Sequence, residues 1–338
     1  MVINLENLIE NILQSLNPKQ KRIMVKRYGL AGKQETLQEI GDVLAITRER
    51  VRQIENQSLL KIQKEINKSF GEIVDIAKNY LREGEGVEEE YGFMRNIARL
   101  LGIDPTAKNI ENKIQFFFFA AGEPLYEKEG TDTKGFWHLG KEEKEKLLNY
   151  IKEAIAFFEE AGREGIFGNS ELREKINEYA NSSLLQISKK FGKNAFGDFG
   201  LMTWAEIKPK NVRDKAYLAI KKHGKPLHFE QIAKLIHENK ISAKPVNTQT
   251  VHNELIKDKR FVLVGRGMYG LKEYGYLPGT VREVIVNLIK ENGPLNSKEV
   301  VELVNQKRFL KENTILLNLQ NRKRFRRLET GKYDIREA

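Results

Sequence analysis

The sequence predicts a mainly helical α+β protein, in which a helix-turn-helix is followed by tandem winged-helix units. Three observations predict this fold class. Residues 36–55 (TLQEIGDVLAITRERVRQIE) have the pattern of two helices around a tight corner. Two segments of similar sequence begin near Lys222 and Lys290, each with apolar residues at helical spacing. A ribbon that turns at a glycine is expected after each of them.

The helix-turn-helix can be followed residue by residue. Its first helix is expected to begin at Thr36, which can form a capping box with Glu39. An apolar stripe at helical spacing follows, formed by Leu37, Ile40, Val43 and Leu44. Residues 45–46 make the corner, Thr47 caps the second helix, and that helix is expected to continue through Ile66.

The second helix separates two kinds of side chain at about 100° per residue. The face expected to read base edges carries Arg48, Glu49, Arg52, Gln53 and Asn56. Arginine pairs with guanine, glutamine pairs with adenine, and glutamate accepts from cytosine. The opposite face is expected to pack on the first helix and carries Val51, Ile54 and Ser58. A solvated polar face is the plainer alternative, but a carboxylate such as Glu49 gains nothing from approaching phosphates.

The amino-acid sequences of these segments also resemble those of a known family. Residues 17–30 (NPKQKRIMVKRYGL), with TLQEIG and TRERVRQIE, resemble region 4 of sigma-70 family initiation factors over about residues 5–66. The resemblance implies that residues 47–64 read a −35 promoter element. It places Arg48, Glu49, Arg52 and Gln53 at bases, with Arg50 and Lys61 near phosphates. It also implies that apolar residues of the preceding helices meet the beta-subunit flap of core RNA polymerase. No −10-reading or core-binding region is recognised elsewhere, so an ordinary sigma factor is not expected.

Two C-terminal units are expected to share one order of elements: helix, short strand, two helices and a ribbon. Residues 222–236 are similar to residues 290–304, and residues 259–271 to residues 323–335. The earlier unit resembles the HARE-HTH family, which includes the N-terminal domain of the RNA polymerase delta subunit. Its motifs are RDKAY at 213–217, GKPLHF at 224–229 and RFVLVGRGMYGL at 260–271. The resemblance implies nucleic-acid or polymerase association without catalysis. Two weaker copies are expected within residues 91–139 and 141–204, the second with a short strand at Ile166–Phe167.

The third helix of each C-terminal unit is expected to face DNA. In the earlier unit this helix covers residues 248–257, and its short polar readers are Gln249, Thr250, His252 and Asn253. Its wing side carries Lys259, Arg260 and Arg266. In the later unit the helix covers residues 312–321 and is followed by Arg322, Lys323, Arg324, Arg326 and Arg327. That run is expected to contact phosphates; its alternative role is charge protection of an exposed ribbon edge.

The charge is unevenly distributed along the 338 residues, whose formal net charge is +11. Residues 19–64 carry 11 Lys and Arg against 5 Asp and Glu, residues 65–207 carry 19 against 26, and residues 208–338 carry 28 against 14. Attraction to a polyanion therefore belongs to the two ends. The acidic stretch 84–90 is the expected linker. The expected domains are residues 1–68, 69–140, 141–207, 208–275 and 276–338.

Several functions are disfavoured by the composition. The chain has no cysteine, and its histidines match no metal-ligand spacing. The GxGxxG match at Gly265–Gly270 lies in an expected ribbon, outside the strand-to-helix context of a dinucleotide site. We therefore expect a cytoplasmic, non-enzymatic regulator of transcription initiation that binds duplex promoter DNA, with no cofactor, metal, membrane or small-molecule substrate. The alternatives are an accessory subunit of core RNA polymerase and, less favoured, a partner of a DNA-modifying enzyme.

Overall fold

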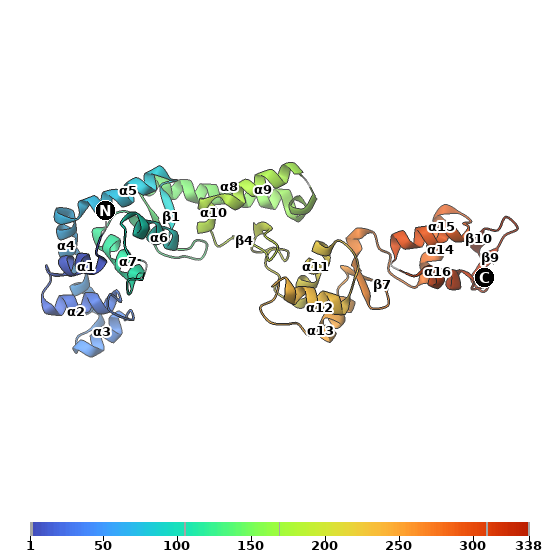
Figure 1. The fold of residues 1–338 in the computed structure, drawn as a ribbon, viewed down its shortest axis with the longest axis horizontal. Helices are drawn as coiled ribbons and strands as arrows, with labels where there is room; N and C mark the ends of the chain where they lie inside the picture. Colours follow the sequence, from blue (N-terminus) through green and yellow to red (C-terminus); the bar gives the residue numbers. More distant parts are fainter. Residues whose placement is uncertain (1–2, 105, 169, 309, 337–338) are drawn as a thin grey trace. The chain divides into compact units, whose positions relative to one another are not determined.

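The computed structural model describes residues 3–104, 106–168, 170–308 and 310–336. The chain forms two compact units, Met1–Phe191 and Gly192–Ala338. Both are mainly helical with small antiparallel sheets, which confirms the expected α+β class (Figure 1). The finer five-part division stays a prediction. No helix within the described ranges is both long and apolar enough to cross a membrane.

The N-terminal unit begins with five helices: α1 (Leu5–Leu13), α2 (Pro18–Arg27), α3 (Leu37–Leu44), α4 (Arg48–Ser69) and α5 (Gly71–Glu83). Each of the first four starts at a side chain that accepts the backbone N–H three residues later. These caps are Asn4, Asn17, Thr36 and Thr47. The caps satisfy amides that the helix itself leaves unpaired, which is why the helices begin at these residues. The expected end of α4 at Ile66 is extended to Ser69.

Eight further elements complete this unit: β1 (Val87–Glu89), α6 (Glu90–Leu100), α7 (Ile110–Ala121), β2 (Leu125–Glu127), β3 (Phe136–His138), α8 (Lys141–Gly168), α9 (Ser170–Asn181) and α10 (Ser183–Ile187). The three strands pair antiparallel in the order β1-β3-β2. Two expectations are wrong here. The acidic linker at 84–90 contains strand β1 instead, because Val87 is buried and pairs with His138. The strand expected at Ile166–Phe167 is part of helix α8.

One apolar core joins the helix-turn-helix to the segment that follows it. It contains residues of α1, α4, α5, α6 and α7, together with Trp137 of β3. Helix α7 contributes Phe116, Phe117 and Phe118, and it contacts both α1 and α4. Hydrogen bonds also join α7 to the helix-turn-helix segment. Asn112 Nδ2 donates to Gly29 O at 3.1 Å, and Gln63 Nε2 donates to Ala121 O at 2.9 Å.

This shared core bears on the expected contact between the preceding helices and a polymerase flap, which stays a prediction. The apolar residues of α1, one of those helices, are buried inside the chain itself. Leu8, Ile9 and Ile12 are each at most 4% exposed, and they lie in one cluster with the phenylalanines of α7. Lys113 of α7 also forms an ion pair with Glu6 of α1. Helix α7 therefore covers α1.

The C-terminal unit contains two repeats of similar element order. The first comprises α11 (Val212–His223), β6 (Leu227–His228), α12 (Phe229–Glu238), α13 (Thr248–Lys257), β7 (Phe261–Gly265) and β8 (Met268–Leu271). The second comprises α14 (Val281–Asn292), α15 (Ser297–Lys307), α16 (Glu312–Leu319), β9 (Phe325–Arg327) and β10 (Tyr333–Ile335). The first has a sheet of order β6-β8-β7, and in the second Leu295 bridges Tyr333 beside the β9–β10 ribbon. Each repeat has a core of its own. Strands β4 (Phe191–Lys193) and β5 (Phe199–Leu201) pair ahead of them.

Candidate nucleic-acid interface

The corner between α3 and α4 has the geometry that the sequence predicts. Thr36 and Glu39 form the expected capping box, and Ala45 ends α3 in the left-handed conformation with φ 53°. The N–H of Ile46 donates to Gly41 O at 3.0 Å. A Cβ on Gly41 would lie 2.7 Å from Ile46 O, closer than side-chain carbons come to an oxygen. Glycine at position 41 is therefore what lets the two helices approach.

Packing behind the corner fixes the orientation of α4. Ile40, Val51 and Ile54 form a small core with Ile23 of α2, and Ser58 Oγ donates to Ile54 O at 2.6 Å. The expected buried face of α4 is thus confirmed. The expected apolar stripe of α3 is wrong at one residue, because Val43 is 55% exposed. Helical geometry puts Val43 roughly 90° away from the centre of the stripe formed by its other members.

A buried carboxylate ties α4 to α2. Glu55 is 8% exposed, and its Oε1 accepts from Arg27 Nε at 3.1 Å and from Tyr28 Oη at 3.0 Å. Burial, and then the neighbouring Glu55 carboxylate, raise the pKa of Tyr28 far above its ordinary value. Sequence reasoning did not single out Glu55, although helical periodicity places it on the buried side with Val51 and Ser58. Its contacts hold the recognition helix in one orientation.

The opposite face of α4 is exposed to solvent. The six exposed residues at its N-terminal end are Arg48, Glu49, Arg50, Arg52, Gln53 and Asn56. Arg52 donates to both oxygens of Glu49, from Nε at 2.9 Å and from Nη2 at 2.7 Å, and Arg50 Nη1 donates to Gln53 Oε1 at 3.0 Å. The Arg52 hydrogen bond holds the pKa of Glu49 below its ordinary value. Exposed pairs of this kind are weak, so these groups can exchange partners for bases.

Lys61 lies further along the same helix. Its side chain is exposed, and its Nζ donates to Gln20 Oε1 of α2 at 3.2 Å. An amide partner leaves the ammonium charge uncompensated. Lys61 therefore keeps the charge that a phosphate contact requires, and this role stays a prediction.

In the C-terminal unit, α13 exposes three of its four expected readers. Gln249, Thr250 and Asn253 are exposed, and Gln249 Nε2 donates to Asn253 Oδ1 at 3.1 Å. His252 is different, because its ring packs between Phe229, at 4.6 Å, and Tyr269, at 5.9 Å. His252 is thus part of the packing beneath the helix.

The cations on the wing side also differ from one another. Lys259 and Arg266 are exposed. Arg260, by contrast, donates to Asp258 at 2.7 Å and to Asp214 at 3.0 Å, and its guanidinium lies over the Tyr217 ring. Two carboxylates of the chain therefore occupy donors of Arg260, which makes it a weaker candidate for a phosphate contact. Asp258 lies two residues before Arg260, but Asp214 lies 46 residues away, and the pattern of residue types could not reveal that second partner.

The cationic run after α16 lies at the surface. Arg322, Lys323, Arg324, Arg326 and Arg327 are all exposed. Arg326 Nη2 pairs with Asp334 of the neighbouring strand at 2.8 Å, and Arg327 lies 6.0 Å from the Tyr333 ring centroid. Within the described ranges the first three cations form no ion pair with a carboxylate, although Arg324 lies close enough to Glu283 to help lower the pKa of that carboxyl. They are the better candidates for phosphate contact.

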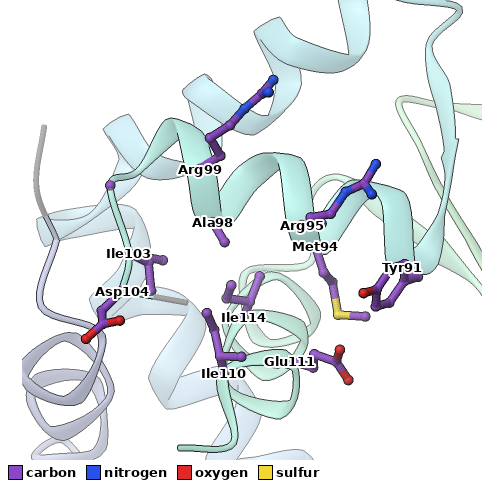
Figure 2. Close-up of a pocket in the computed structure, with 11 residues that line it drawn as sticks. Tyr91, Met94, Arg95, Ala98, Arg99, Ile103, Asp104, Ile110, Glu111 and Ile114 are labelled. Carbon is purple, nitrogen blue, oxygen red and sulfur yellow. The ribbon is translucent and has the colours of Figure 1, made fainter. Parts of the chain in front are cut away.

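A cavity of about 590 Å³ lies in the N-terminal unit between α6 and α7 (Figure 2). Figure 2 shows Met94, Ala98 and Ile114 pointing into it, while Arg95 and Arg99 point away. The lining is therefore mainly apolar. Over the described parts of the chain, no group of three or more His, Asp or Glu side chains is placed to hold a metal ion.

Helices α3 and α4, with the tight corner between them, define a helix-turn-helix, a motif class that commonly binds DNA. Comparison with known proteins assigns this domain further: residues 12–64 match the family model described as Sigma-70, region 4. The resemblance seen in the sequence is thereby confirmed for the N-terminal domain. The HARE-HTH resemblance of the C-terminal half stays a prediction.

Three sigma factors are each similar to a short part of this chain. RNA polymerase sigma factor sigF, chloroplastic, of Arabidopsis thaliana is 39% identical over 64 residues, which are 19% of this chain and 12% of that protein. SigA of Microcystis aeruginosa is 40% identical over 75 residues, 22% of this chain and 17% of that protein. RpoD of Helicobacter pylori is 41% identical over 76 residues, 22% of this chain and 10% of that protein. The chain thus spans less than a fifth of the length of these relatives.

Proposed function

We propose that this protein is a cytoplasmic, non-enzymatic DNA-binding regulator of transcription initiation. Helix α4 reads a −35-like promoter element in the major groove. The two repeats of the C-terminal unit act as winged helices, the first of them HARE-like, and hold further duplex. Several weak contacts on one chain add affinity through effective concentration.

The exposed face of α4 carries the proposal. Arg48, Glu49, Arg52 and Gln53 are exposed together on one face, and they lie inside the residues that match sigma-70 region 4. Their side chains offer the donors and the acceptor that distinguish base pairs in the major groove. The buried contacts of Glu55 support this role, because a recognition helix must be held in a fixed orientation to select bases.

The order of elements supports the winged-helix part of the proposal. In the first repeat, α13 follows α12 as the second helix of a helix-turn-helix, and the β7–β8 hairpin follows α13 as a wing. The surplus of 28 Lys and Arg over 14 Asp and Glu in residues 208–338 favours a polyanionic partner.

The covered surface of α1 favours DNA reading over the rival function. The rival is an accessory subunit that grips the flap of core RNA polymerase through the sigma-like domain, with incidental DNA contact. The acidic stretch 65–207 favours that rival, since it is unsuited to a polyanion. A flap segment would, however, have to displace α7 to reach Leu8 and Ile12. Reading by α4 needs no such rearrangement.

The test uses the full-length protein and a pool of random duplexes, from which the preferred sequence is selected. Arg52→Ala should then cost about 1–3 kcal/mol on the selected site and much less on a scrambled one. Arg82→Ala is the matched control, because Arg82 is an exposed arginine of α5 whose Nη1 donates only to Asn79 of its own helix, at 2.7 Å. Arg82→Ala should change neither affinity.

Equal losses of affinity for Arg52→Ala on both duplexes would contradict base reading and would indicate that α4 contacts only phosphates. Co-elution with core polymerase, in the absence of any preferred duplex, would favour the accessory-subunit function instead.

A further inference from the structure

A cavity of about 690 Å³ lies in the C-terminal unit, between the β7–β8 hairpin and the connection from α15 to α16. Its lining residues are Arg266, Asn305, Arg308, Leu310, Lys311 and Thr314. Three of the six are cationic, and none is acidic. The cavity therefore has the charge of an anion site.

Arg308 is the central group of this lining. It is 6% exposed, so its guanidinium has lost nearly all contact with bulk water. Its Nη1 donates to Leu263 O and, at 3.1 Å, to Leu277 O, and its Nη2 donates to Gly279 O at 2.6 Å. These carbonyls come from the hairpin and from the chain that leads into α14. They hold the side chain in one position.

The charge of Arg308 has no counterion. Over the described ranges, no carboxylate lies within ion-pair distance of it, and its Nε has no hydrogen-bond partner. Burial accordingly lowers the pKa of Arg308. A buried cation without a negative partner is costly, and proteins normally pair such a charge. An anion in the cavity would compensate it.

The N-terminus of α16 points to the same ligand. The N-cap of this helix is Lys311, whose side chain makes no capping hydrogen bond. The amide of Thr314 donates to Lys311 O at 2.9 Å, but over the described ranges the amides of Glu312 and Asn313 have no hydrogen-bond partner. Lys311 and Thr314 both line the cavity, which places that end of the helix at its wall. A helix N-terminus attracts phosphate through these donors and its dipole. Glu312 lies in the same turn but does not line the cavity.

We propose that this cavity binds a phosphate group, held by Arg308, Lys311, Arg266 and the N-terminus of α16. The phosphodiester backbone of duplex DNA is the source that fits the rest of the unit, because Arg266 belongs to the hairpin assigned above as a wing. This part rests on the proposed function. A free phosphate or a nucleotide offers the same chemistry, and the experiment below separates these sources.

Lys311→Asp is the decisive variant. Aspartate at an N-cap satisfies helix amides, so the variant should melt no earlier than the wild type. The same carboxylate blocks the anion site and reverses its charge. Lys298→Asp is the matched control, since Lys298 is exposed in the first turn of α15 and that helix is already capped by Asn296.

Two titrations of the full-length proteins read out the result. Phosphorus NMR with inorganic phosphate should show binding to the wild type and to Lys298→Asp, and a loss of about tenfold or more for Lys311→Asp. With duplex DNA, Lys311→Asp should reduce the slope of log K against log salt by about one unit relative to the control.

Undetectable phosphate binding by the wild type, or equal binding by all three proteins, would overturn the site. A phosphate loss without a change of slope would overturn the DNA backbone as the source and leave a free phosphate or nucleotide. If the protein binds no duplex but Lys311→Asp still loses phosphate, the proposed function fails and the site stands.

Discussion

Because the helix-turn-helix and α7 share one core, we predict that the stability of the helix-turn-helix depends on Phe116, a residue of α7 that is far from it in the sequence. Phe116 of α7 is fully buried, and its ring centroid lies 4.9 Å from that of Tyr28 in the helix-turn-helix domain. Phe116→Ala should lower the free energy of unfolding by about 3–5 kcal/mol, because it removes a buried ring and leaves a cavity. Domains are stable by only about 5–15 kcal/mol. The substitution should therefore loosen the recognition helix as well as α7.

Amide hydrogen exchange of the full-length protein, read peptide by peptide, measures this coupling. Peptides from α4 should lose protection together with peptides from α7. Phe119→Ala is the matched control, because Phe119 is the same residue type on the same helix but is 46% exposed. It should cost about 1 kcal/mol. Lost protection in α7 alone, with α2–α4 as protected as in the wild type, would refute a common core.

Three further predictions concern the corner, its cap and the cationic run. Gly41→Ala should destabilise by about 1–3 kcal/mol and abolish specific DNA binding, because the new Cβ would meet Ile46 O at 2.7 Å; a melting curve and a binding assay check this. The hydrogen bonds of Thr36 hold the pKa of Glu39 below its ordinary value, so the stability they give is present at neutral pH and is lost as the pH falls through that lowered pKa. Glu39→Gln should remove this part of the acid dependence in denaturation curves; an unchanged pH profile would contradict the cap. Replacing the cations of the run after α16 that form no ion pair, Arg322, Lys323 and Arg324, should flatten the salt slope of DNA binding by up to about one unit per contacted phosphate. The effect should be larger than that of replacing Arg326 and Arg327.

Local features of the fold were predictable because they depend on neighbours in the sequence. The capping box at Thr36, the corner at residues 45–46 and the exposed face of α4 follow from side-chain type and helical period. The same holds for the hairpin that turns at Gly267, where φ is 68°. Each is decided within about one or two turns of chain.

Other features depend on residues far apart, and periodicity could not decide them. The acidic stretch 84–90 resembles a linker in composition, yet it supplies an edge strand because β3 is there to pair with it. Arg260 has the residue type of a phosphate contact, but Asp214, which lies 46 residues away, accepts from its guanidinium. The residue type shows which hydrogen-bond donors and charges a side chain has. Only the packed structure shows whether another residue of the chain already binds them.

The sequence by itself determined that this protein carries a sigma-70 region 4 helix-turn-helix with an exposed polar face on α4, since a short motif of fixed spacing specifies both its fold and the side chains on that face. The tertiary structure decided which surfaces of that domain are free. It buried α1 beneath the phenylalanines of α7, and it enclosed Arg308 without a counterion at the end of α16. Burial depends on contacts between segments separated by tens of residues, and no local pattern encodes these contacts.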